Sequence, residues 1–286
     1  MLALGVRGGL YAGDSSCYLV GIDGRFPLQL DGGSFTEGVD RALALGTLKG
    51  TLPDLVAGLR AILVTHIHLD HLHGWALRSV IDLGQRLRGE APAPLVLSNP
   101  DTVRSLQRHV FNGELWFDAA TAASGKPVYL YQSLGDGETL PLEQLASGLL
   151  LHHLRMEHPV PTSAFLIELD GQVLAYFGDT GPLPPTFWKE RFLPRVEKAR
   201  RVSVVIEVSF SNEKEALATS SGHLTPTLLA SQLAHLPESL RSRLDLFLTH
   251  LKPGEEVGIH AQLEPLRSMV RSLTVPVQGA RYALGR

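Results

Sequence analysis

The sequence of 286 residues contains a single cysteine and no long uninterrupted hydrophobic run. Cys17 therefore cannot form an internal disulfide, and it lies in an apolar stretch typical of a strand, so we expect a small buried residue. No run of about 18 apolar residues marks a membrane span, and residues 1–13 lack the basic start and apolar centre of a secretory signal. These absences predict a soluble, cytoplasmic protein without a membrane partner.

Neither positive nor negative charge predominates in the chain. The chain has 26 Lys and Arg against 29 Asp and Glu, a net charge of −3, and no basic block. Because the phosphate backbone dominates nucleic-acid affinity, this composition argues against a nucleic-acid partner. With 44 % hydrophobic residues and no repeat, low-complexity tract or linker, we expect one domain over residues 1–286. The composition allows a homodimer.

Short apolar runs alternate with helical patterns along the chain. Residues 17–22 and 27–30 flank Asp-Gly and predict a hairpin, and a second hairpin surrounds Asp170-Gly171. A helix is expected over residues 53–59, followed by a buried strand that ends at His66, a helix after Gly74 and another strand near residues 94–100. Two halves of this kind predict an α/β sandwich.

The stretch THIHLDHLHG, Thr65 to Gly74, places four histidines and one aspartate within ten residues. Imidazole nitrogen and carboxylate oxygen both bind zinc or a similar divalent ion, and a loop at a strand end can turn alternate residues inward. With this composition, H-x-H-x-D-H should arise by chance in roughly one in a thousand chains. We therefore interpret His66, His68, Asp70 and His71 as metal ligands, His73 as a neighbour of the site, and Gly74 as room for the turn into the helix.

These motifs resemble the metallo-β-lactamase superfamily and, within it, the class II cyclic-nucleotide phosphodiesterases. The resemblance extends through HVFNGELWFD, FGDTGP, IEVSFSNE, GHLTP and THLKP, and so covers nearly the whole chain. It implies a four-layer αββα fold with a dinuclear metal site. It also implies that a hydroxide bridging two divalent ions, Zn²⁺ or alternatively Mn²⁺ or Fe²⁺, hydrolyses a 3′,5′-cyclic nucleotide such as cAMP or cGMP to the 5′-monophosphate.

A site of this type requires three further ligands. Asp179, between glycine and threonine at the end of an apolar run, fits the bridging carboxylate, and His250 in FLTHLKP fits the second ion beside Asp70 and His71. His158 fits the third histidine of the first ion, beside His66 and His68, because it lies in the loop where the family places this ligand. The adjacent His152 and His153 remain alternatives for that position.

Two residues are candidates for proton transfer. The related tRNase Z branch has a histidine and a glutamate near the metals, and His223 in SSGHLTP and Glu207 at the end of VVIE resemble that pair. The resemblance implies that His223 binds substrate and acts as general acid for the leaving 3′ oxygen, that Glu207 orients it, and that Asp70 also serves catalysis.

The sequence indicates few residues that could select the substrate. Asn112 is a candidate for the base pocket, whereas we expect Phe111 and Trp116 to belong to the core and Lys252 to be solvated. A cysteine-ligand β-lactamase is disfavoured because Cys17 lies far from the motifs. A glyoxalase-type thioesterase would need a larger C-terminal domain, and a tRNase Z-like nuclease a basic arm. A non-catalytic nucleotide-binding protein is a further alternative, although all seven ligand positions are filled.

Overall fold

The computed structural model describes residues 1–120 and 125–284. It contains two compact units. The first comprises Met1–Val6, Tyr11–Gly135 and Val277–Tyr282, and the second comprises Arg7–Leu10 and Asp136–Pro276 with Ala283 and Leu284. Each unit has its own sheet and its own core. The candidate ligands of the histidine motif belong to the first unit, and His158, Asp179 and His250 belong to the second.

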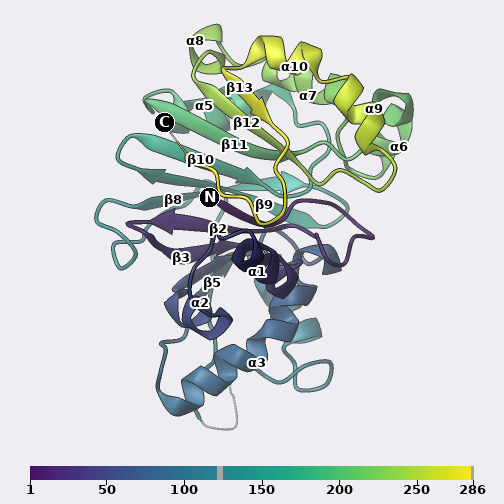
Figure 1. Ribbon diagram of the computed structural model, residues 1–286. Helices are drawn as coiled ribbons and strands as arrows, with labels where there is room; N and C mark the ends of the chain where they lie inside the picture. Colours follow the sequence, from purple (N-terminus) through teal and green to yellow (C-terminus); the bar gives the residue numbers. More distant parts are fainter. Residues whose placement is uncertain (121–124, 285–286) are drawn as a thin grey trace. The chain divides into compact units, whose positions relative to one another are not determined.

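The first unit is a six-stranded sheet in the order β1 to β6 (Figure 1). Its N-terminal strands form the predicted hairpin, with Asp23 and Gly24 in the left-handed conformation that a tight turn requires. From β3 onward the strands are parallel. The strands are β1 Leu2–Gly5, β2 Cys17–Ile22, β3 Arg25–Leu30, β4 Ala61–Leu63, β5 Leu95–Ser98 and β6 Leu130–Ser133.

Helices of the first unit bury apolar faces against this sheet. The helix predicted over residues 53–59 is α2, which begins after Thr51, whose side chain forms a capping box with Asp54. Buried side chains of the first two helices pack with β1 to β3, and Trp75 of α3 packs with β4 and β5. The helices are α1 Phe35–Ala44, α2 Leu52–Gly58, α3 His73–Arg88 and α4 Pro100–Ser105, with a π-helical turn, η2, at Leu106–Val110.

A C-terminal segment completes the first unit. The amide of Gly279 donates to the carbonyl of Ala3 at 2.7 Å, and the amide of Tyr282 donates to Met1 at 2.7 Å. Nothing in the local pattern of these residues indicates such a return, because the partner strand lies at the other end of the chain.

The second unit is a seven-stranded sheet in the order β13-β12-β11-β10-β9-β8-β7 (Figure 1). The predicted hairpin at Asp170-Gly171 joins β9 and β10, and β10, β11, β12 and β13 are parallel. The strands are β7 Thr139–Pro141, β8 Leu150–Glu157, β9 Pro161–Leu169, β10 Gln172–Phe177, β11 Arg201–Glu207, β12 Leu244–Thr249 and β13 Ser272–Thr274.

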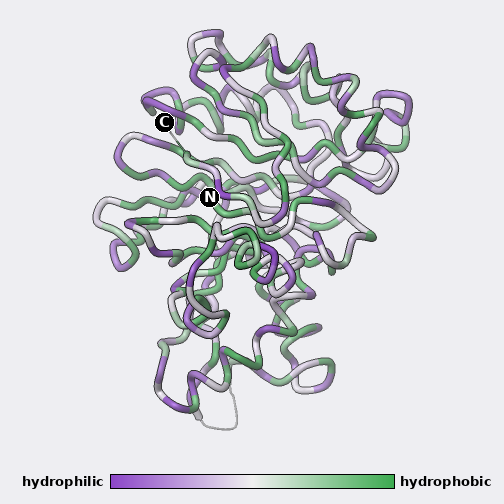
Figure 2. The backbone as a smooth tube through the Cα atoms, in the orientation of Figure 1, coloured by the Kyte–Doolittle hydropathy of each residue, from purple (hydrophilic) through white to green (hydrophobic). Residues whose placement is uncertain are grey.

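The core of the second unit joins the sheet to its helices. Trp188 is fully buried and stacks on Phe177, while Leu229 and Leu233 of α7 pack into the same cluster. Apolar colour follows the strands and polar colour the outer loops (Figure 2). The helices are α5 Leu193–Val196, α6 Glu215–Ser220, α7 Pro226–Leu233, α8 Glu238–Arg241, α9 Glu256–Ala261 and α10 Glu264–Met269, with short turns η3 Phe187–Phe192 and η4 Asn212–Lys214. Among the residues described, no helix has the length and hydrophobicity needed to cross a membrane.

Candidate metal centre

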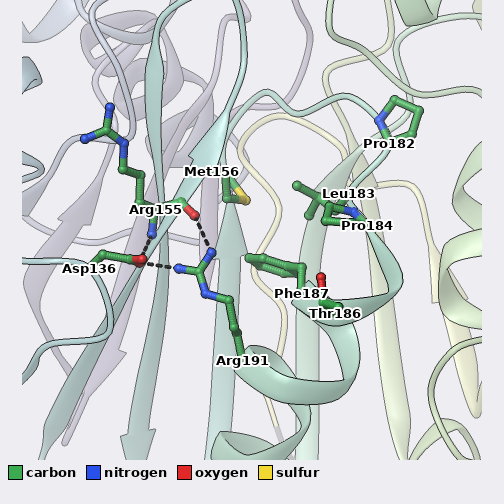
Figure 3. Close-up of a pocket in the computed structure, with 9 residues that line it drawn as sticks. All are labelled: Asp136, Arg155, Met156, Pro182, Leu183, Pro184, Thr186, Phe187 and Arg191. Carbon is green, nitrogen blue, oxygen red and sulfur yellow. Dashed lines mark hydrogen bonds and ion pairs between the residues drawn. The ribbon is translucent and has the colours of Figure 1, made fainter.

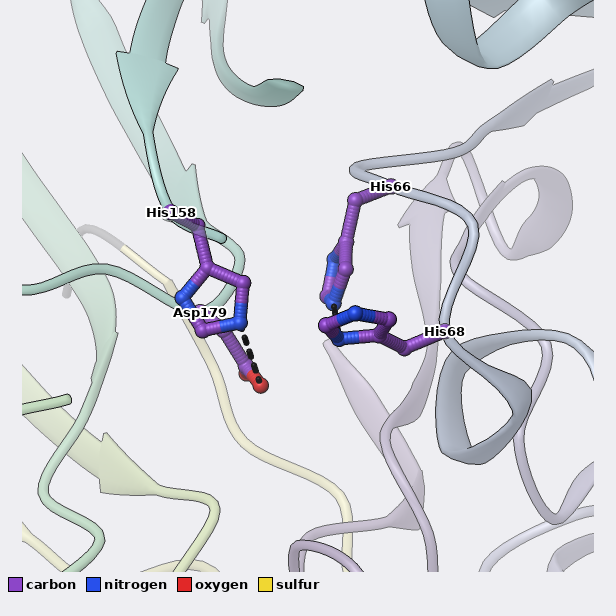
Figure 4. Close-up of side chains that lie close together, drawn as sticks. All are labelled: His66, His68, His158 and Asp179. Carbon is purple, nitrogen blue, oxygen red and sulfur yellow. Dashed lines mark hydrogen bonds and ion pairs between the residues drawn. The ribbon is translucent and has the colours of Figure 1, made fainter. Parts of the chain in front are cut away.

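The histidine motif of the first unit occupies the loop between β4 and α3. His66 and His71 are buried and His68 and Asp70 are half-buried, with a single 3₁₀ turn, η1, at Leu69–His71. The Nε2 atom of His66 lies 3.0 Å from Nδ1 of His68 (Figure 4). The loop therefore brings two ring nitrogens to one point, as a metal site requires.

Asp31 follows β3 and fixes the orientation of two of these histidines. Its Oδ2 atom accepts from Nδ1 of His71 at 2.8 Å and from Oγ1 of Thr65 at 2.8 Å. Since the Thr65 hydroxyl proton goes to Asp31, its oxygen accepts from Nδ1 of His66 at 3.0 Å. His66 and His71 therefore carry their protons on Nδ1, which leaves a lone pair on each Nε2 for a metal.

Gly74 and His73 complete the turn into α3. A Cβ atom on Gly74 would lie 2.0 Å from the carbonyl oxygen of Gly33, so the glycine provides the room that the sequence predicted. His73 directs its two ring nitrogens toward the carbonyl oxygens of Leu69 and Ala12, at 3.1 and 3.0 Å. It stabilises the loop around the motif.

In the second unit, parallel strands bring the remaining candidates to one edge of the sheet. Asp179 follows β10, Glu207 ends β11 and His250 follows β12, and these three strands are adjacent and parallel. The carboxyl ends of parallel strands share one edge, which is the usual location of sites in such sheets. Nε2 of His250 lies 3.2 Å from Oδ1 of Asp179.

His158 lies at the same edge. Its Nδ1 donates to the carbonyl of Gly222 at 2.8 Å, and its Nε2 lies 3.9 Å from Oδ2 of Asp179 (Figure 4). Gly222 has φ +72°, and a Cβ atom there would lie 2.9 Å from the His158 ring, so only glycine permits this approach. Burial lowers the pKa of His158 despite the nearby Asp179 carboxylate, which favours a neutral imidazole.

The two alternatives to His158 make other contacts. His152 lies 3.0 Å from a carboxylate oxygen of Glu168, and His153 lies 2.9 Å from the hydroxyl of Ser163, both on the neighbouring strand β9. The geometry of the second unit thus favours His158 as the partner of Asp179.

His250 is held in an uncommon conformation. Its φ of +62° lies in the left-handed region, which non-glycine residues rarely adopt outside functional sites. Ser209 donates to Glu207, so its oxygen accepts from Nδ1 of His250 at 3.0 Å. A Cβ atom on Gly8 would lie 2.4 Å from the ring, so a glycine backbone packs directly against it.

The positions of the protons on His158 and His250 indicate whether a metal fits these residues. His158 and His250 both use Nδ1 as a donor, so each directs a lone pair on Nε2 toward the carboxylate oxygens of Asp179. Two acceptors facing each other repel unless a proton or cation lies between them. The donor set of the second unit therefore fits a divalent cation, and the buried histidine and aspartate groups indicate a metal site.

His223 and Glu207 form a pair beside Asp179. Nδ1 of His223 lies 2.7 Å from Oε1 of Glu207, and both side chains are buried. Burial lowers the pKa of His223, but the Glu207 and Asp179 carboxylates raise it by more, so the net shift is upward. The arrangement suits a histidine that holds a proton.

Asn112 occupies a turn of the first unit. Its side-chain oxygen accepts from the amides of Glu114 and Leu115, and its nitrogen donates to the carbonyl of Arg108. Phe111 is buried as expected, and Nε1 of Trp116 donates to Ser79 at 2.9 Å. A base contact by Asn112 stays a prediction.

A separate cavity of about 250 Å³ lies in the second unit (Figure 3). Arg191 donates to Asp136 and to the carbonyl of Arg155, and it lies over the Phe187 ring, so its charge is already engaged. None of the candidate ligands lines this cavity. The other lining residues are Met156, Pro182, Leu183, Pro184 and Thr186.

Asp31, missed at the sequence level, provides a direct test of the donor arrangement. We expect Asp31→Asn to weaken zinc binding by about 10- to 100-fold. Oδ1 of Asp31 accepts from the Thr65 amide while Oδ2 accepts from the Thr65 hydroxyl and His71, and an amide side chain has only one acceptor oxygen for these two sides. Zinc competition titration against a chromogenic chelator would measure this. Wild-type affinity in the variant would show that Asp31 does not orient the ligands.

Comparison with known proteins decides the family. The family model of class-II cAMP phosphodiesterases matches residues 51–272. The chain belongs to this family. The cyclic-nucleotide phosphodiesterase activity that the resemblance implied is thereby confirmed.

Individual relatives agree. The chain of this class-II phosphodiesterase is similar to a 3′,5′-cyclic-nucleotide phosphodiesterase of Aliivibrio fischeri, at 27 % identity over 311 residues, covering 97 % of this chain and 90 % of the relative. Among solved structures it is similar to unliganded yeast PDE1, with a TM-score of 0.78, 17 % identity and 97 % of each chain covered. The metallo-β-lactamase fold protein YhfI of Bacillus subtilis gives a TM-score of 0.68 at 17 % identity, covering 98 % of this chain and 96 % of that one. The predicted metallo-β-lactamase-like fold is confirmed.

Proposed function

We propose that this phosphodiesterase binds two divalent metal ions and hydrolyses 3′,5′-cyclic nucleotides to 5′-monophosphates. The observation that carries the proposal is the direction of the imidazole lone pairs. In each unit, Nδ1 of the buried histidines donates a hydrogen bond, which leaves Nε2 as the acceptor, and in the second unit two of these Nε2 atoms face Asp179.

The ligands divide into two sets with one shared residue. We assign His66, His68 and His158 to the first ion, Asp70, His71 and His250 to the second, and Asp179 to both. Histidine and carboxylate suit Zn²⁺, and they also suit Mn²⁺ or Fe²⁺. When bound, such a pair of ions supplies a nucleophile from water at neutral pH and neutralises charge on the phosphoryl oxygens.

His223 is the residue that we assign to the leaving group. Glu207 accepts from its Nδ1 at 2.7 Å, so the Nε2 edge of the ring is directed away from Glu207 and can contact the substrate. A proton given there to the departing 3′ oxygen avoids an alkoxide. Glu207 holds the ring and favours its protonated form, and Ser209 joins the same carboxylate to His250.

The partner of this site is a small cyclic nucleotide, and the preference between cAMP and cGMP is open to measurement. A cytoplasmic location and a homodimer stay predictions from the sequence.

Turnover on a panel of diesters tests the proposal. Metal-loaded protein should convert 3′,5′-cAMP or 3′,5′-cGMP to the 5′-monophosphate, identified by ³¹P NMR, and should leave 2′,3′-cAMP largely intact. A chelator should remove the activity, and added Zn²⁺ or Mn²⁺ should restore it. Formation of the 3′-monophosphate, or activity that persists after metal removal, would contradict the proposed reaction.

A further inference from the structure

Arg78 places a full positive charge in the interior of the first unit. Its side chain is fully buried in the middle of α3, and its guanidinium lies 4.3 Å from the centroid of the Phe35 ring. Nη1 donates to Oε1 of Gln29 at 2.9 Å, and Nε lies 3.4 Å from Oδ2 of Asp82. A buried charge costs much desolvation energy and seldom adds net stability, which points to a role other than stabilisation.

The donor-only chemistry of arginine sets the orientation of Gln29. Because the guanidinium has no acceptor, the side-chain amide of Gln29 must turn its oxygen toward Arg78. Its nitrogen then points the other way and donates to the backbone carbonyl of Asp31 at 2.7 Å. The Gln29 side chain is fully buried, so no solvent competes for either end of the amide.

The carbonyl that Gln29 holds belongs to a residue with an uncommon backbone. Asp31 has φ +50°, in the left-handed region, and this conformation directs its carboxylate at Thr65 and His71. A hydrogen bond to the Asp31 carbonyl favours the one peptide orientation that is compatible with this geometry. The relay thus runs from Arg78 through Gln29 and Asp31 to the two histidines whose protons Asp31 controls.

We propose that Gln29 and Arg78 are positioning residues for the metal centre, acting through the Asp31 backbone to hold His66 and His71 in the Nδ1-protonated form. This inference rests on the proposed metal site for its effect on metal affinity. Its effect on the histidine protons concerns the metal-free protein and stands apart from turnover.

The other side of Arg78 provides a matched control. Oδ2 of Asp82 accepts from the hydroxyl of Tyr129 at 3.0 Å, and burial raises the pKa of Asp82 against the opposing effect of Arg78. This side stabilises the buried charge through Asp82 and Tyr129, whereas the opposite side reaches the Asp31 carbonyl through Gln29. Asp82→Asn should therefore lower the midpoint of urea unfolding without altering the histidines.

Gln29→Glu separates positioning from packing. The carboxylate keeps the contact with Arg78 and nearly the same volume, yet it has no N–H to donate to the Asp31 carbonyl. We expect zinc affinity to fall by about tenfold, which is the lower end of the range for residues that orient metal ligands through hydrogen bonds. In ¹H–¹⁵N spectra of metal-free protein labelled on histidine, the Nδ1-protonated signals of His66 and His71 should lose population.

The outcomes decide between the alternatives. Gln29→Met, which removes both hydrogen bonds without adding charge, should change the spectrum in the same direction as Gln29→Glu. A wild-type spectrum and wild-type zinc affinity in both Gln29 variants would overturn the inference, as would an equal change in Asp82→Asn. If the wild-type protein bound no metal, the proposed function would fail, while the metal-free spectra would still test the relay.

Discussion

Asp179→Ala is expected to lower turnover of 3′,5′-cAMP by about 10³-fold or more and to reduce the metal bound per chain. Asp179 is the carboxylate that two imidazole lone pairs of the second unit face, so its loss removes the group assigned to both ions. Metal ions bound at such a site would supply several kcal/mol of transition-state stabilisation, and each 1.36 kcal/mol is a factor of ten in rate. Steady-state kinetics with metal analysis of the same samples would measure both effects.

Asp170 offers a matched control. Like Asp179 it follows a strand of the second sheet, but it is an exposed turn residue with φ +50°. Asp170→Asn should keep wild-type turnover and metal content, because asparagine tolerates this conformation. If Asp179→Ala kept activity within a few-fold of Asp170→Asn, the bridging role would be wrong.

His223→Ala is expected to reduce turnover of 3′,5′-cAMP by about 10² to 10⁴-fold with little change in metal content. The size of the loss should depend on the leaving group. A ribose alkoxide needs a proton, whereas p-nitrophenolate leaves without one, so bis(p-nitrophenyl) phosphate should be hydrolysed by the variant nearly as fast as by the wild type.

The comparison of the two substrates distinguishes proton donation from a structural role. A variant that merely disturbed the site would lose activity on both. His260→Ala, at an exposed position of α9, serves as the control and should leave both rates unchanged. Equal losses on both substrates in His223→Ala would exclude the general-acid assignment.

Much of the architecture could be predicted because its signals are local. Asp23-Gly24 and Asp170-Gly171 mark both hairpins, since each aspartate and glycine adopts the positive φ of a tight turn. The helix expected at residues 53–59 appears at Leu52–Gly58, displaced by one residue. The return of Gly279 to β1 could not be predicted, because that pairing depends on residues far apart in the chain.

In the candidate site, too, local patterns indicated some residues and not others. Spacing alone indicated the four residues of the motif, and the resemblance to the family supplied Asp179, His158 and His250. The local pattern could not separate His158 from His152 and His153, because the distinguishing contacts come from Gly222, in the turn after α6, and from Asp179, which follows β10.

Residues that orient the ligands left only weak signals. Asp31 precedes two glycines at the end of a strand, which indicates a turn but not the contacts with Thr65 and His71. Ser209 has no distinctive sequence pattern, and its contact with His250 depends on the pairing of β11 and β12. Gln29 and Arg78 read as a strand residue and a helix residue. Their roles arise from packing, where donors and acceptors must match one by one.

Anomalous diffraction at the metal edge, on crystals of the zinc-loaded protein, tests the central claim most directly. We predict two peaks about 3.5 to 4 Å apart, the first bound by His66, His68 and His158, the second by Asp70, His71 and His250, with Asp179 contacting both. A single peak, or two peaks held by other residues, would contradict the dinuclear account.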